Sequence, residues 1–205
     1  MKKVMIAVPT FENITPDTFK SIYDLDKAGC ECIFEFQRGY DCATARNNIA
    51  QGALNLGVDY VFMVDNDIVL PQDALVKLME GEPDIVLGHC PARNSANIYD
   101  GKTAIYRLGE FNFTDQITVA EMKNLENNSV SRFHVHGGGM AIALIKTELF
   151  KKLPYPWFDW VNYENKGVLS EDLYFCEKCN NAGIQINVDP RVGCGHLMRH
   201  VQWGI

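Results

Sequence analysis

The sequence predicts an α/β fold in a single domain over residues 1–205, with a mixed, mostly parallel central sheet flanked by helices. Strand and helix patterns alternate over the first ninety residues, which is typical of parallel strands joined by right-handed crossovers. Several strand candidates are apolar throughout, as strands buried on both faces are. The composition, 47% hydrophobic and 22% charged, is ordinary for a globular protein and excludes general disorder.

The N-terminal half predicts four strands separated by three helices. Residues 4–8 form a fully apolar run, typical of a buried strand. Thr15 and Pro16 supply an N-cap and a proline at the first helical position, so a helix is expected from there to about Ala28, ending at Gly29. The further elements expected are a strand at 32–36, a helix at 43–56 with Gly57 after its end, a strand at 60–64, a helix at 71–80 and a strand at 85–89.

The second half is less regular and begins with a polar, Asn-rich stretch at 91–131. A connection of this length is more often a functional loop or subdomain than a simple linker. Within it, Thr118 and Glu121 form a capping box that opens a short helix. The other elements expected are strands at 103–108, 132–136, 140–145 and 185–188, a tight turn at 137–139, a short helix at 147–153, and a helix from Ser170 to Gly183.

The charge and the cysteines limit the class of protein. The formal net charge is −7, whereas proteins that coat nucleic acids or membrane surfaces usually present a basic face. There is no apolar stretch long enough to span a bilayer, and the N-terminus does not read as a signal peptide. The seven cysteines are an odd number, unlike a secreted disulfide framework. We therefore expect a cytoplasmic protein and leave its oligomeric state open.

Two aspartates follow the apolar strand at 60–64. Alternate residues of an extended segment face the same way, so Asp65 and Asp67 point together into the crevice at the carboxyl ends of the strands. Hard oxygen ligands of this kind suit Mg²⁺ or Mn²⁺ on phosphate oxygens. A pair of turn-capping aspartates is the structural alternative. Phosphatases of the haloacid dehalogenase type also carry Asp-x-Asp after a strand, but usually after the first one.

A second acidic pair and a late histidine extend the candidate site. Glu171 and Asp172 open a helix, where one of them is a candidate general base. The alternative is that both acids only complement the helix dipole while Ser170 caps the helix. His196 lies between glycines near the C-terminus, and a neutral imidazole suits Mn²⁺ as a further ligand.

In their order and spacing these stretches resemble small glycosyltransferases of the GT-A fold, the Rossmann-like fold of nucleotide-diphospho-sugar transferases, in the style of glycosyltransferase family 2. The resemblance covers almost the whole chain. It implies that residues 1–90 bind the nucleotide and that residues 91–205 bind the acceptor, with a metal-binding C-terminal tail. The matching stretches are Val8-Pro9-Thr10, Ala45-Arg46-Asn47, Val64-Asp65-Asn66-Asp67, Gly137-Gly138-Gly139-Met140, Ser170-Glu171-Asp172 and Gly195-His196.

The resemblance also implies roles for single residues. Asp67 and His196 would bind Mn²⁺ or Mg²⁺ on the diphosphate, and Asp172, or Glu171 beside it, would be the general base that activates an acceptor hydroxyl. The donor would be a nucleotide-sugar, with UDP as the expected nucleotide. The donor-binding residues implied are Pro9, Thr10, Glu35, Arg46, Asp65, Asn66, Gly138 and Gly139.

Within that set, Arg46 would contact uracil and Thr10 the base or ribose through its backbone. Glu35 stands near the place where many relatives carry an acidic residue that reads the base or ribose. Gly138 and Gly139 would let the backbone approach the donor sugar without obstruction.

The acceptor side is less specific. His136 flanks the region, and Trp157 and Phe158 could stack on an acceptor sugar or belong to the core. The sequence leaves open whether the acceptor is a glycan, a protein or a small molecule, and whether transfer inverts or retains. A nucleotidyltransferase of related fold is disfavoured, because the loop at residues 9–13 lacks the Gly- and Lys/Arg-rich composition that would hold a triphosphate. A non-catalytic nucleotide- or sugar-binding module is a further alternative.

Overall fold

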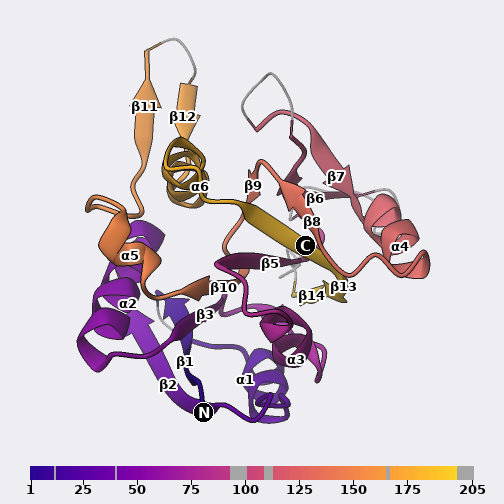
Figure 1. Cartoon of the computed structure of the whole chain (residues 1–205), viewed down its shortest axis with the longest axis horizontal. Coiled ribbons are helices and arrows are strands. Elements are labelled where there is room, and N and C mark those ends of the chain that lie inside the picture. The colour runs from indigo at the N-terminus through magenta and orange to yellow at the C-terminus, as the bar shows by residue number, and fades with distance from the viewer. Residues whose placement is uncertain (12, 40, 93–100, 109–112, 165–166, 198–205) are drawn as a thin grey trace, which may run out of the picture.

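The computed structural model describes residues 1–11, 13–39, 41–92, 101–108, 113–164 and 167–197 (Figure 1). A seven-stranded sheet forms its centre, with the strand order β2-β1-β3-β10-β5-β13-β8. β10 and β8 run antiparallel to their neighbours, and the other pairs are parallel, which confirms the mixed, mostly parallel sheet. In chain order the strands are β1 (Lys3–Thr10), β2 (Glu31–Arg38), β3 (Tyr60–Val64), β5 (Ile85–His89), β8 (Phe133–Val135), β10 (Ile142–Lys146) and β13 (Ile186–Gly193).

Helices cover both faces of this sheet. Successive strand residues point to opposite faces, so Met5 and Met63 belong to one core cluster and Ile6 and Phe62 to the other. The first cluster includes side chains of α2, α4, α5 and α6, and the second includes side chains of α1 and α3. The helices are α1 (Pro16–Tyr23), α2 (Cys42–Leu56), α3 (Ala74–Met79), α4 (Val119–Asn127), α5 (Leu149–Lys152) and α6 (Glu171–Asn181).

Many helices and strands begin or end where the local sequence predicts. The strands at 60–64 and 85–89 have the expected bounds, and Gly57 ends α2 in the left-handed conformation with φ 64°. Thr118 and Glu121 form both hydrogen bonds of the capping box. α1 is shorter than expected, because the backbone N–H of Asp26 bonds the carbonyl of Gln72 and its carboxylate accepts the N–H of Ala28, which turns the chain away. α3 is also shorter than the expected 71–80, and β13 is longer than the expected 185–188.

Three small sheets complete the fold. β7 (Gln116–Thr118), β6 (Lys102–Tyr106) and β9 (Gly137–Gly138) form one of them, so the tight turn expected at 137–139 is wrong. β11 (Val161–Tyr163) and β12 (Gly167–Leu169) form a hairpin, and β4 (Ile68–Val69) pairs with β14 (Gly195–His196). In the part of the chain that is described, no helix has the length and apolar character needed to cross a lipid bilayer.

Candidate active site

The pairing of β4 with β14 brings two distant parts of the chain together. β3 ends at Val64, and the following residues lead into β4, whose Ile68 lies opposite His196. The backbone N–H of Leu197 also donates to the carbonyl of Asp67, at 2.9 Å. Residues 195–197 are therefore held along the Asp-x-Asp segment by backbone hydrogen bonds, at the carboxyl edge of the parallel strands.

Asp67 and His196 face each other in this edge. Nε2 of His196 is 3.6 Å from Oδ2 of Asp67, and their side chains are 11% and 15% exposed. Nδ1 of His196 lies 2.8 Å from the carbonyl oxygen of Pro91, so Nδ1 carries a proton that it donates to this carbonyl. A backbone carbonyl of this kind fixes the tautomer of metal-binding histidines and leaves Nε2 directed at the metal.

The electrostatics of the pair fit a cation. The hydrogen bond to Asp67, followed by one to Cys90, raises the pKa of His196 to about 10. Without a metal ion the imidazole is therefore positively charged beside the carboxylate, and a divalent cation would take the place of that proton. One carboxylate oxygen and one imidazole nitrogen suit Mn²⁺. The described residues hold no cluster of three or more metal-binding side chains, so the other ligands would have to be substrate oxygens and water.

Arg46 lies at the centre of a buried ion-pair network. Its side chain projects from α2, and Nη2 is 3.0 Å from Oδ1 of Asp65 while Nε is 3.4 Å from Oε1 of Glu171. Nη1 donates to the carbonyl of Met140, at 3.3 Å. Arg46 is 2% exposed, so its guanidinium bonds to these carboxylates and is not accessible to a nucleobase. The expected contact of Arg46 with uracil is therefore corrected: Arg46 links α2, the end of β3 and α6.

The two acids at the start of α6 have different surroundings. Glu171 is buried, and burial, followed by the charge of Asp172, raises its pKa while Arg46 opposes the rise. Asp172 is half-buried, and Oδ1 accepts hydrogen bonds from the Ser170 hydroxyl and from the backbone N–H of Leu173. Ser170 is the N-cap residue of α6, but its hydroxyl bonds Asp172 and makes no side-chain cap to the helix backbone, unlike the structural alternative considered from the sequence. Of the two acids, Asp172 is the one with access to solvent.

At the end of β1 the polar groups bond mainly to each other. The Thr10 hydroxyl donates to the carbonyl of Asn13, at 2.9 Å, and the amide of Asn66 donates to the same carbonyl at 2.7 Å. Pro9 is buried beside Thr10, while Glu35 lies opposite Ala7 on β2, three residues before that strand ends. The structure thus brings Asn66 and Thr10 together beside Asp65 and places Glu35 further down the sheet.

The glycines of β9 serve the packing of the protein itself. A Cβ on Gly138 would lie 2.6 Å from Cδ1 of Ile105 and 2.9 Å from the carbonyl oxygen of Ala104. Gly138 therefore lies against the protein interior, which corrects its expected place beneath the donor sugar. A Cβ on Gly139 would lie 3.3 Å from Oδ2 of Asp172, so Gly139 alone of this pair adjoins the acidic group.

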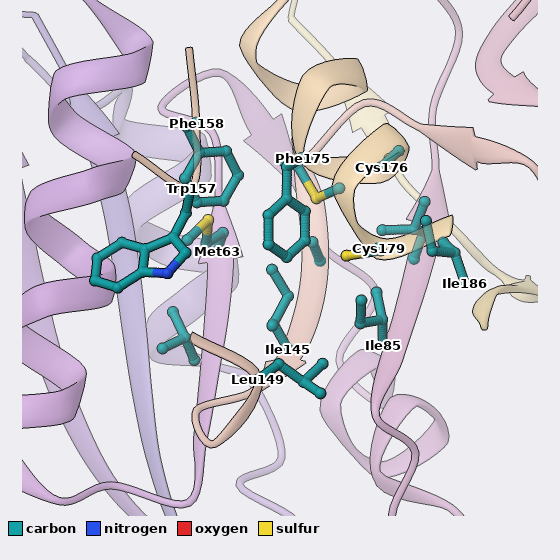
Figure 2. Close-up of a cluster of buried hydrophobic side chains, with 14 of the residues drawn as sticks. Met63, Ile85, Ile145, Leu149, Trp157, Phe158, Phe175, Cys176, Cys179 and Ile186 are labelled. Atoms are coloured by element: carbon teal, nitrogen blue, oxygen red, sulfur yellow. The ribbon is translucent and has the colours of Figure 1, made fainter. Parts of the chain in front are cut away.

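Trp157 and Phe158 belong to the core and cannot stack on an acceptor, which corrects that expectation. Figure 2 shows both rings among buried side chains of the first core cluster. The Phe158 and Phe175 rings stack with centroids 4.7 Å apart. Asn47 holds the segment to α2, since its amide donates to the Phe158 carbonyl at 2.7 Å and its oxygen accepts the N–H of Trp157.

His136 lies in an aromatic group that includes neither Asp67 nor His196. The centroid of its ring is 4.7 Å from that of Phe113, and the Phe113 ring packs edge to face with Tyr106. Burial, followed by the charge of His134, lowers the pKa of His136. Burial and then the charge of Asp172 raise the pKa of Tyr106. Tyr106 is thus a neighbour of Asp172 that sequence reasoning missed, because a tyrosine on a short strand within a polar stretch carries no distinctive signal.

Comparison with known proteins identifies the fold. No protein-family model matches the sequence, and no curated protein is similar to it in sequence. Among solved structures the chain is similar to A197 from STIV, with a TM-score of 0.61 and 19% identity over 97% of this chain and 87% of A197. It is also similar to GalNAc-T7, solved with UDP, GalNAc and Mn²⁺, with a TM-score of 0.64 and 10% identity over 97% of this chain and 44% of that one. The chain thus spans less than half of GalNAc-T7, and what the likeness shows is the fold: this chain has the GT-A fold of glycosyltransferases.

Proposed function

We propose that this chain is a metal-dependent glycosyltransferase that transfers a sugar from a nucleotide-diphospho-sugar, with UDP as the nucleotide, to an acceptor hydroxyl. The observation that carries the proposal is the Asp67–His196 pair, joined across 129 positions of the sequence (196 − 67) with Nε2 directed at the carboxylate. The fold supports it, because the similar GalNAc-T7 structure contains UDP and Mn²⁺. Residues 1–90 then supply most of the donor site and residues 91–205 the acceptor site.

The residues of the site divide the chemistry between them. When bound, Mn²⁺ or Mg²⁺ supplies positive charge to the leaving diphosphate. Asp67 and His196 would hold that ion, and Asp65, Thr10 and Asn66 line the donor side. Buried Arg46 keeps Asp65 and Glu171 in place through the hydrogen bonds described above.

Asp172 is the group we assign as general base. Its carboxylate is half-buried and accepts a hydrogen bond from the Ser170 hydroxyl. It lies close to Gly139, where a Cβ atom would come within 3.3 Å of Oδ2. A carboxylate accepts the proton of an attacking hydroxyl when the two oxygens are within hydrogen-bond reach. Glu171 is paired with Arg46, so its role is to position the start of α6. The sugar centre becomes oxocarbenium-like as the nucleotide leaves, as in glycoside hydrolysis.

The experiment is a nucleotide-sugar turnover assay with purified protein, Mn²⁺ and a panel of UDP-sugars. We expect UDP release that stops with a chelator and falls by at least about 100-fold in Asp67→Asn and Asp172→Asn. Asp115→Asn is the matched control, since it changes an exposed carboxylate that pairs with Arg107 at 3.3 Å. Turnover that is unchanged in both site variants would overturn the proposal, and release of pyrophosphate from a nucleoside triphosphate would favour a nucleotidyltransferase.

A further inference from the structure

The β11–β12 hairpin stands out from the body of the protein beside α6 (Figure 1). Val161 pairs with Leu169 and Asn162 with Val168 in antiparallel register. β12 runs directly into Ser170 and the start of α6, so the hairpin is continuous with the helix that carries Asp172.

The two faces of the hairpin differ. Tyr163 lies on one face, and its hydroxyl donates to Oε2 of Glu177 on α6, at 2.5 Å, which holds this face against the helix. The other face carries Asn162 and Val168, which lie opposite each other, and Val168 is 66% exposed. Trp160 precedes β11 on the same alternation and is 55% exposed. An indole, an amide and an isopropyl group thus form one solvent-facing surface.

This surface adjoins the proposed base. The paired residues of the ladder end at Val161 and Leu169, and Trp160 and Ser170 are the next residues on the two strands. The Ser170 hydroxyl donates to Oδ1 of Asp172. Trp160 and Ser170 therefore adjoin the same end of the ladder, the end from which α6 with Asp172 continues.

We propose that Trp160, Asn162 and Val168 form the acceptor platform of this protein and that the acceptor is a neutral saccharide. An indole ring packs against the C–H face of a sugar ring, and an amide can form a hydrogen bond with a hydroxyl group at the edge of that sugar. Exposed Glu164 follows Asn162 on the same alternation, so a negatively charged acceptor is disfavoured. This inference rests on the proposed function for the reaction, but the binding of a saccharide to the platform can be measured without it.

Two readouts test the platform. Saturation-transfer NMR with a panel of neutral methyl glycosides, in the presence of UDP and Mn²⁺, reports binding, and transfer from UDP-sugars to the same glycosides reports the reaction. We expect Trp160→Ala to weaken glycoside binding about tenfold and to lower the ratio of transfer to donor hydrolysis by a similar factor. Trp160→Phe should restore most of both signals. Tyr23→Ala is the matched control, because Tyr23 is an exposed aromatic residue at the end of α1.

The outcomes separate this inference from the proposed function. If the wild type binds no neutral glycoside, or if Trp160→Ala binds and transfers like the wild type, the platform is wrong even when donor hydrolysis is intact. If donor turnover is absent but glycoside binding is lost in Trp160→Ala, the platform stands and the proposed reaction fails. Protection of Trp160 by a second copy of the chain, seen as a dimer that Trp160→Ala dissolves, would also overturn the saccharide assignment.

Discussion

Replacing Arg46 should show how much the buried ion pairs stabilise the folded protein. In Arg46→Met the side chain keeps much of its length but loses its bonds to Asp65, Glu171 and Met140. Glu171, with a side chain 7% exposed, is then left without its cation, whereas Asp65 is 30% exposed and can be hydrated. Breaking a buried ion pair on one side costs about 3–5 kcal/mol, and we assign most of this cost to Glu171.

The loss should depend on pH in a defined direction. Burial already raises the pKa of Glu171 above its ordinary value of 4.5, and Arg46 is the group that opposes the rise. Without Arg46 that pKa rises further, so between the unfolded-state pKa and this raised pKa the folded state binds more protons than the unfolded state. Stability then falls as the pH increases, and the deficit of Arg46→Met should be larger at about pH 7.5 than at about pH 5.

Urea unfolding of the wild type and variants measures this free energy. At about pH 7.5 we expect the free energy of unfolding of Arg46→Met to fall by about 3–5 kcal/mol, which for a chain of this size lowers the melting temperature by roughly 10 °C. The double variant Arg46→Met/Glu171→Gln should recover about 1–3 kcal/mol, since it no longer buries an unpaired charge. A deficit below about 1 kcal/mol, or one that does not change with pH, would refute this reasoning.

Three further substitutions test the packing assignments. Gly138→Ala should lower the free energy of unfolding by about 1–3 kcal/mol, because its Cβ would meet the Ala104 carbonyl at 2.9 Å; normal stability in thermal unfolding would argue against the close β6–β9 contact. Phe158→Ala truncates a core side chain and should lower the free energy of unfolding by about 3–5 kcal/mol. A change in the KM for the acceptor at unchanged stability would instead indicate that Phe158 contacts the acceptor. Thr118→Ala should cost about 1 kcal/mol through loss of the capping box, and Lys123→Ala on the exposed side of α4 should not.

Much of the fold could be predicted because it is set by local patterns. The buried strand at 60–64, the left-handed Gly57 and the capping box at Thr118 each depend on neighbouring residues alone. The position of β10 between β3 and β5 could not be predicted. A strand buried on both faces has the same apolar pattern whether its neighbours run parallel or antiparallel.

The candidate site was predictable in part for the same reason. Asp65 and Asp67 follow a strand whose end lies at a sheet edge, a relation that local sequence reveals. The burial of Arg46 was not predictable, because arginine on a helix is usually exposed and its two acidic partners lie 19 and 125 positions away. Among the aromatic residues, Trp157 is buried and Trp160 is exposed, although three positions separate them, and only the packing against α2 distinguishes them.

The most direct test is the binding of Mn²⁺ followed by electron paramagnetic resonance. Protein is added to Mn²⁺ with and without UDP, and the loss of the free-ion signal measures the bound fraction. If Asp67 and His196 hold the cation on the diphosphate, UDP should strengthen Mn²⁺ binding in the wild type, and Asp67→Asn and His196→Ala should each weaken it at least about tenfold. Mn²⁺ binding with UDP that is equal in the wild type and both variants would contradict the metal site.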